Sequence, residues 1–112
     1  DKNVVKFLER GLTLEGYRVT TCASGDDALL HLAKNSPDVM ILDWMMPGLS
    51  GDQVLLRLLE QHHKPPVIML SARDSAFDQE RVLKSGADVF LSKPVDFDKL
   101  LGHLRSLTNS QT

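Results

Sequence analysis

The chain has 112 residues, of which 42% are apolar and 25% are charged, and its formal net charge is −2. This balance is typical of one globular domain, and because no basic excess is present to neutralise phosphates, it argues against direct binding of DNA or RNA. The single cysteine, Cys22, excludes a disulfide framework and a cysteine-based zinc site, and no apolar run is long enough to span a membrane.

Helix-like and strand-like hydrophobic patterns alternate along the chain. In the first half they predict a helix ending near Gly16, a strand over Tyr17–Cys22, a helix from Ser24 to Leu32 and a buried strand over Val39–Leu42. In the second half they predict a helix from Ser50 to Leu59, a strand over Val67–Leu70, a helix from Ser75 to Ser85, a strand over Val89–Leu91 and a helix over Phe97–Leu107. A polar tail at 108–112 is expected to fray. This alternation predicts a parallel sheet between two layers of helices, a three-layer α/β fold.

Chemically useful side chains follow the predicted strands that end in Asp43, Ser71 and Lys93. Taken singly, each has a plainer interpretation, as a turn residue, a helix cap or a surface charge. In parallel sheets, however, functional groups gather at the carboxyl ends of the strands. A carboxylate nucleophile, a hydroxyl donor and an ammonium charge together suit the capture of a phosphoryl group.

The pattern of these residues resembles a known family. The run Leu42–Gly51, followed by Ser71-Ala72 and by Lys93-Pro94, resembles the receiver domain of bacterial two-component response regulators, and the likeness covers essentially the whole chain. It implies a flavodoxin-like, doubly wound parallel sheet with strand order 2-1-3-4-5. It also implies that the Lys93-Pro94 bond is cis.

The resemblance implies a role for each residue of the predicted site. Asp43 would be the phosphoacceptor, and Mg²⁺ (or Mn²⁺) would bind its carboxylate and the backbone carbonyl of Met45. Lys93 would pair with the phosphoryl oxygens, while Ser71 and Ala72 would bind the phosphate after transfer.

Further roles implied by the resemblance concern switching and turnover. Phe90 would follow Ser71 by moving its ring inward and so repack the face made by the fourth helix, the last strand and the last helix. Core packing is an equal alternative for Phe90, which alternates with apolar neighbours in a strand. Met45 and Arg73 would flank the attacking water and tune dephosphorylation.

The implied partners are a sensor histidine kinase or a phosphotransfer protein, with a homodimer through the switching face as a further expectation. The implied location is the cytoplasm, in keeping with the lone cysteine. Neither nucleic acid nor a membrane is expected as a partner of this domain.

One departure from the family pattern concerns the start of the chain. In the family register Asp1 falls one position beyond a pair of metal-binding acids, so that pair and the strand before it are expected to be missing from the given sequence. Truncation is the favoured interpretation. A degenerate receiver that acts as a phosphorylation-independent interaction module, or a strand donated by another chain, remains an alternative.

Other classes of site find less support. An aspartyl phosphatase would need a second acid two positions after the nucleophile, where Met45 stands, and no Ser/Thr-rich loop suits FMN. Cys22 is expected to be a buried small hydrophobe, not a reactive thiol. No pair of histidines has the helical spacing of a metal site, so surface positions are expected for His31, His62, His63 and His103.

Overall fold

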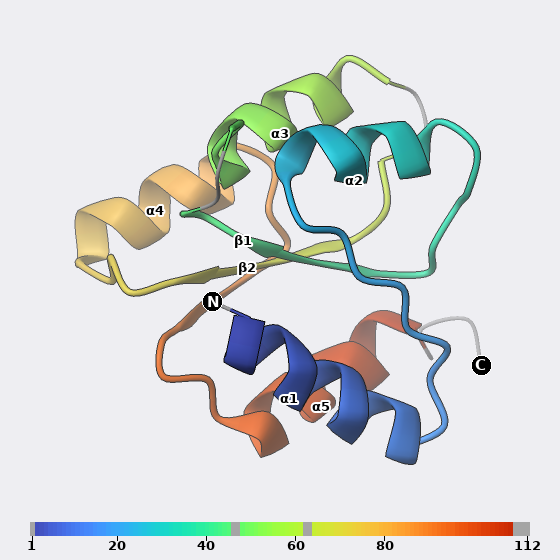
Figure 1. Ribbon diagram of the computed structural model, residues 1–112. Helices are drawn as coiled ribbons and strands as arrows, with labels where there is room; N and C mark the ends of the chain where they lie inside the picture. Colours follow the sequence, from blue (N-terminus) through green and yellow to red (C-terminus); the bar gives the residue numbers. More distant parts are fainter. Residues whose placement is uncertain (1, 46–47, 62–63, 109–112) are drawn as a thin grey trace.

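The computed structural model describes residues 2–45, 48–61 and 64–108. Its helices and strands alternate as the sequence predicts from residue 25 onward (Figure 1). The elements are α1 (Lys2–Leu14), α2 (Gly25–Leu32), β1 (Met40–Asp43), α3 (Gly51–Leu59), β2 (Val67–Ser71), α4 (Ala76–Lys84), β3 (Val89–Ser92) and α5 (Phe97–Thr108).

The strands of the described residues form one parallel sheet in the order β1-β2-β3. These are the last three strands of the expected order, and their sequence in the sheet agrees with it. The register pairs Asp43 with Leu70 and Ser71 with Ser92. Because the pairing is parallel, all three strands deliver their last residues to the same edge of the sheet.

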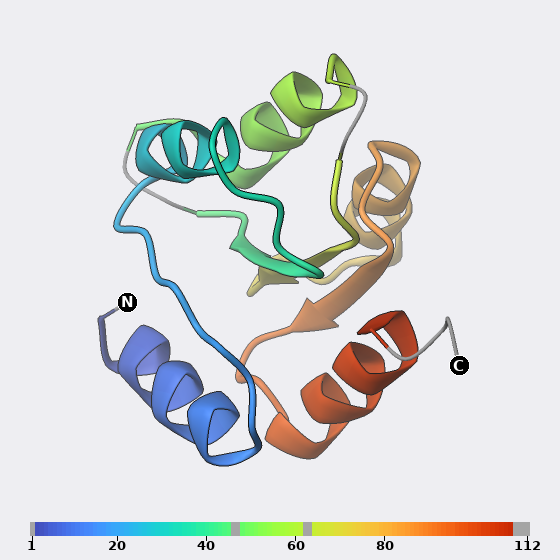
Figure 2. The same cartoon turned by 90° about the vertical axis from the view of Figure 1, so that its right-hand side faces the viewer.

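Helices cover both faces of this sheet, as Figures 1 and 2 show: α1 and α5 lie on one side and α2, α3 and α4 on the other. The central strand β2 is buried throughout. Its Val67 and Met69 pack in the core beneath α3, while Ile68 and Leu70 pack in the core beneath α1 and α5. This alternation is the period of two that a strand buried on both faces must have.

The predicted strand over Tyr17–Cys22 is wrong. The segment between α1 and α2 has no strand pairing, and it passes from one helical layer to the other on the β1 side of the sheet (Figure 2). Tyr17 and Val19 still rest against the α1–α5 core, so their apolar pattern reflects packing without a hydrogen-bonded ladder. Cys22 is exposed, not buried, because no strand places it inside.

Side-chain hydrogen bonds cap α2, α3 and α4 at the residues where the sequence predicts these helices to begin. Ser24 Oγ accepts a hydrogen bond from the backbone N–H of Asp27, at 3.2 Å, at the start of α2. Before α3, the backbone N–H of Ser50 donates to Gln53 Oε1 at 2.9 Å.

Thr108, predicted to belong to the tail, is the last residue of α5, and its hydroxyl donates to the Leu104 carbonyl. Residues 109–112 of the predicted tail lie outside the described residues.

Candidate functional site

Asp43 and Lys93 meet at the carboxyl edge of the sheet. Lys93 Nζ lies 2.7 Å from Asp43 Oδ2, and each side chain keeps 24% of its surface exposed. Asp43 ends β1 and Lys93 follows β3, the two strands on either side of β2. Their contact therefore depends on the register of both strand pairs, β1 with β2 and β2 with β3. The Lys93-Pro94 peptide bond that follows is cis, as the resemblance implies. The pair places an anionic oxygen and a cation together in a partly open position.

Ser71 lies between them at the end of β2, with only 1% of its surface exposed. Its Oγ accepts a hydrogen bond from the backbone N–H of Arg73 at 2.9 Å, and its carbonyl accepts one from the N–H of Lys93 at 2.9 Å. The hydroxyl therefore closes the turn after β2, and its own proton is available for a further acceptor.

The loop after Asp43 is fixed by backbone contacts. The N–H of Met45 donates to Asp43 Oδ1 at 3.2 Å, and the N–H of Trp44 donates to the Leu70 carbonyl at 2.9 Å. The N–H of Gly51 then donates to the Trp44 carbonyl at 2.8 Å, which ties the start of α3 to this loop. Both carboxylate oxygens of Asp43 thus have a donor within the site.

Gly51 is required by this close approach. A Cβ at position 51 would lie 2.8 Å from the Asp43 carbonyl oxygen and 2.8 Å from Trp44 Cα, both backbone atoms that cannot move away cheaply. We expect Gly51→Ala to lower the free energy of unfolding by about 3 kcal/mol, as overpacking a tight contact does. Urea denaturation measures this change.

Gly102 is the matched control for this substitution. It lies within α5, and a Cβ there would meet nothing within 4 Å. Gly102→Ala is expected to leave stability unchanged or to raise it by up to about 1 kcal/mol, because alanine has the higher helix propensity. Equal effects of the two substitutions would contradict the close approach at Gly51.

Trp44, the residue after Asp43, is buried beneath two arginines. Its side chain is 3% exposed, and the guanidinium carbons of Arg73 and Arg81 lie 5.0 Å and 5.7 Å from the centre of its ring. Both distances are within the range of cation–π attraction. Nothing in the position of Trp44 along the sequence reveals that cations from two later segments lie over its ring.

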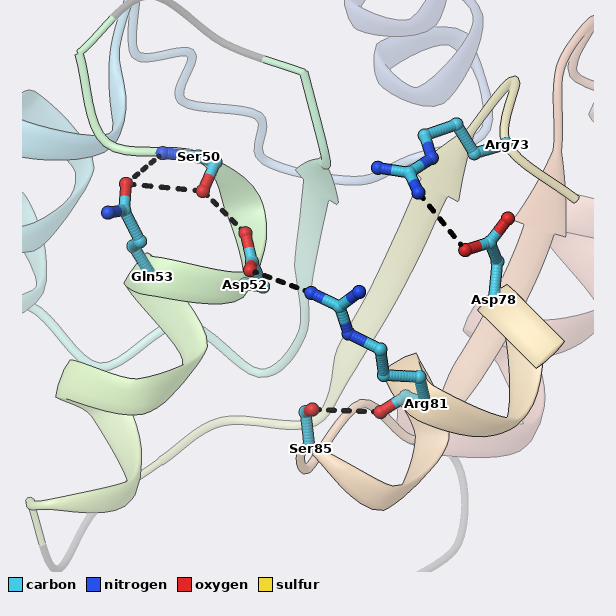
Figure 3. A network of polar contacts seen from close by, with 7 residues as sticks. All are labelled: Ser50, Asp52, Gln53, Arg73, Asp78, Arg81 and Ser85. Carbon is cyan, nitrogen blue, oxygen red and sulfur yellow. Dashed lines mark hydrogen bonds and ion pairs between the residues drawn. The ribbon is translucent and has the colours of Figure 1, made fainter.

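Each of these arginines is also paired with an acid, as Figure 3 shows. Arg73 Nη2 lies 3.3 Å from Asp78 Oδ1, and Arg81 Nη2 lies 3.7 Å from Asp52 Oδ2. Burial alone would raise the pKa of Asp52, but the hydrogen bonds from the Ser50 hydroxyl and from backbone N–H groups, together with Arg81, hold it below its usual value. Asp52 is therefore anionic at neutral pH and available to Arg81.

The other predicted residues differ in their exposure. Met45 is 66% exposed, and Ala72 is also exposed. Phe90 is half-buried against the core beneath α3. Although Cys22 is exposed, partial desolvation of its thiol and the nearby Asp27 raise its pKa, which disfavours a reactive thiolate.

The described residues hold no group of three or more His, Cys, Asp and Glu side chains that could bind a metal. His31 and His103 are half-buried, whereas His62, His63, Pro47 and Asp1 lie outside the described residues. None of the helices described has the length and apolar character needed to cross a bilayer.

Comparisons with known proteins give one consistent family. The model of the response regulator receiver domain matches residues 1–105. The transcriptional regulatory protein PcoR of Escherichia coli is 39% identical over 102 residues, which cover 91% of this chain but 45% of PcoR. The chain thus spans less than half the length of this curated relative.

Solved structures agree with this family. The receiver domain of the Francisella response regulator 1452 matches with a TM-score of 0.96 and 36% identity, covering 100% of this chain and 93% of that one. The receiver domain of the sensor histidine kinase PA1611 of Pseudomonas aeruginosa PAO1, which has a magnesium ion in its active site cleft, matches with a TM-score of 0.82 and 27% identity over 96% of this chain and 88% of that one. The chain therefore belongs to the response regulator receiver domains, the regulatory, non-enzymatic domains of two-component signalling.

Proposed function

We propose that this domain accepts a phosphoryl group on Asp43 and uses it to change its affinity for a partner. The observation that carries the proposal is the 2.7 Å contact between Lys93 Nζ and Asp43 Oδ2 at the carboxyl edge of the sheet. A carboxylate held beside a cation, in a partly open position, has both the nucleophile and the charge that phosphoryl transfer needs.

In the proposed reaction a carboxylate oxygen of Asp43 attacks the phosphorus of a donor phosphohistidine. The new O–P bond makes an acyl phosphate, the P–N bond breaks, and the leaving imidazole takes up a proton. Lys93 would then turn from the carboxylate to the phosphoryl oxygens, which carry more charge. The Ser71 hydroxyl and the backbone N–H of Ala72 would complete the hydrogen bonds to the phosphate.

Mg²⁺ (or Mn²⁺) is the proposed cofactor. Its chemistry would be to neutralise the charge that gathers on the phosphoryl oxygens. The Asp43 carboxylate and the Met45 carbonyl are oxygen ligands of the kind that Mg²⁺ prefers. Both groups are of the right chemical type for Mg²⁺, but they are few. The described residues contain no larger cluster of acidic side chains that would add further ligands.

The proposed output is a change in the face formed by α4, β3 and α5. Ser71 would move toward the phosphate and Phe90, on β3, would follow, so that phosphorylation shifts a population between two packings of this face. We propose a sensor histidine kinase or phosphotransfer protein as the phosphate donor, a homodimer or an output domain as the partner of this face, and the cytoplasm as the location.

Acetyl phosphate labelling of the protein at its natural full length tests this proposal. The expected result is one base-labile phosphate that depends on Mg²⁺ and maps to Asp43. The alternative is a phosphorylation-independent interaction module. It is supported by the small number of metal ligands that the described residues provide. This alternative predicts that no label is incorporated under the same conditions.

A separate prediction concerns the lifetime of the phosphate. The thioether of Met45 is not a base, and the guanidinium of Arg73, which pairs with Asp78 and lies over Trp44, stays protonated, so neither side chain can activate water as a base. We expect the double variant Met45→Asn, Arg73→Glu to lose its phosphate on the order of tenfold faster than the natural chain, because a carboxylate can orient and activate the water. Release of inorganic phosphate after removal of the donor measures the rate.

Arg57→Glu is the control for the charge reversal in this experiment. Arg57 is exposed on α3 and has no part in the site described above. Its substitution should leave the lifetime unchanged. A double variant that turned over at the natural rate would count against a tuning role for positions 45 and 73.

A further inference from the structure

Helix α4 is weakly anchored by apolar packing. Val82 is its only buried residue, while Phe77 and Leu83 are 72% and 45% exposed. By contrast, α3 buries Val54, Leu55 and Leu58. A helix with so little buried apolar surface depends on its polar contacts for its exact position.

Arg81 makes polar contacts that connect α4 with two other segments of the chain. Its guanidinium lies over the ring of Trp44, 5.7 Å from the ring centre, and it pairs at 3.7 Å with Asp52 in the first turn of α3. Figure 3 shows the side chain extending from α4 toward Asp52, which itself accepts a hydrogen bond from the Ser50 hydroxyl. One side chain therefore joins α4, α3 and the loop next to Asp43.

The position of Trp44 makes it sensitive to changes at Asp43. The two residues are adjacent in the chain, and the backbone of Trp44 is hydrogen-bonded both to Leu70 and to Gly51, the first residue of α3. The ring, at 3% exposure, has little room to move without moving the groups packed on it. Arg73 packs on the same ring at 5.0 Å and pairs with Asp78 of α4, which gives a second, shorter connection to this helix.

We propose that Arg81 is a positioning residue that couples the chemical state of Asp43 to the position of α4, through the ring of Trp44 and the carboxylate of Asp52. The inference rests on the proposed function and goes beyond the roles of Ser71 and Phe90, because it adds a route on the α3 side of the helix. A planar guanidinium suits this role, since it can stack on a ring and pair with a carboxylate at once.

The test measures hydrogen exchange of the α4 backbone amides in the natural full-length protein, before and after acetyl phosphate treatment, together with phosphate occupancy at Asp43. In the natural protein, phosphorylation should change the exchange of residues 76–84. In Arg81→Met we expect occupancy to be retained and this change to shrink about two- to fivefold, the factor that a cation–π contact at an exposed site supports. Arg81→Lys should restore part of the response.

Lys84→Met is the matched control, because Lys84 lies on the same helix and pairs only locally with Glu80. It removes a positive charge from α4 without touching Trp44, so the full response should remain. Asp52→Asn, which weakens the ion pair and leaves the stacking arginine in place, should give a response between those of Arg81→Met and the natural protein. This second variant keeps the test decisive if Arg81→Met does not fold.

The outcomes separate this inference from the proposed function. Full occupancy with an undiminished α4 response in Arg81→Met overturns the role of Arg81, and so does an equal loss of response in Lys84→Met. Absence of phosphate on the natural protein overturns the proposed function and the coupling with it. Full occupancy with a smaller response in Arg81→Met, and part of it regained in Arg81→Lys, supports the coupling.

Discussion

Replacing Asp43 by Asn is expected to abolish phosphate uptake while the fold stays intact. The amide has almost the same shape as the carboxylate, but it is a poor nucleophile and carries no charge for a metal ion. The substitution removes one partly exposed ion pair, with Lys93, so the free energy of unfolding should change by no more than about 1 kcal/mol. Incorporation of radiolabelled phosphate and urea denaturation measure the two effects.

Asp38→Asn is the matched control for Asp43→Asn. Asp38 is an exposed acid just before β1, whereas Asp43 is the last residue of the same strand. Its substitution removes the same charge and should leave labelling unchanged. Labelling of the Asp43→Asn variant at the natural rate would refute the assignment of Asp43 as phosphoacceptor.

The central part of the site is predictable from sequence because the strands that build it are short and apolar. Val67–Leu70 is a short, unbroken apolar run, which is typical of a strand buried on both faces, and in the structure it pairs in parallel with both neighbours. Once the register is fixed, Asp43 and Lys93 must emerge at the same edge. Their contact at 2.7 Å confirms the juxtaposition that the sequence predicts.

The contacts of Arg73 and Arg81 with Trp44 were not predictable in this way. On α4, Arg81 follows the pattern of a solvated helical face, and Arg73 stands in a polar turn. Only the packing of α4 beside α3 brings them over one ring and opposite Asp52 and Asp78. Such contacts depend on tertiary geometry that no local periodicity encodes.

The strand predicted over Tyr17–Cys22 failed for a related reason. Its residues have the composition of a strand, but a strand exists only with a hydrogen-bonded neighbour. In the described residues β1 is an edge of the sheet, and the segment packs Tyr17 and Val19 against the α1–α5 core instead. The amino-acid composition of the segment predicts a tendency to form a strand, but a strand forms only where a neighbouring strand is available for hydrogen bonding.

Magnesium binding provides the second prediction of large effect. Trp44 is the only tryptophan of the chain, and its buried ring next to Asp43 makes its emission a reporter of this site. For residues 1–112 alone we expect little change in emission at low millimolar Mg²⁺. The described residues provide one carboxylate and one carbonyl to the ion, and Lys93, at 2.7 Å, competes for that carboxylate. Mg²⁺ gives up its water reluctantly and needs more negative charge than this to enter a site.

A chain preceded by a β-strand that ends in two acidic residues should behave differently. The added carboxylates supply the missing charge beside Asp43, so Trp44 emission should change with Mg²⁺ in a saturable way and lose that response in Asp43→Ala. Lys93→Met in the same extended chain should tighten Mg²⁺ binding, because it removes the competing ammonium. The opposite result for residues 1–112, a saturable change at low millimolar Mg²⁺ that Asp43→Ala abolishes, would mean that Asp43 and its neighbours already form a complete site. The acidic pair would then be unnecessary for metal binding in this chain.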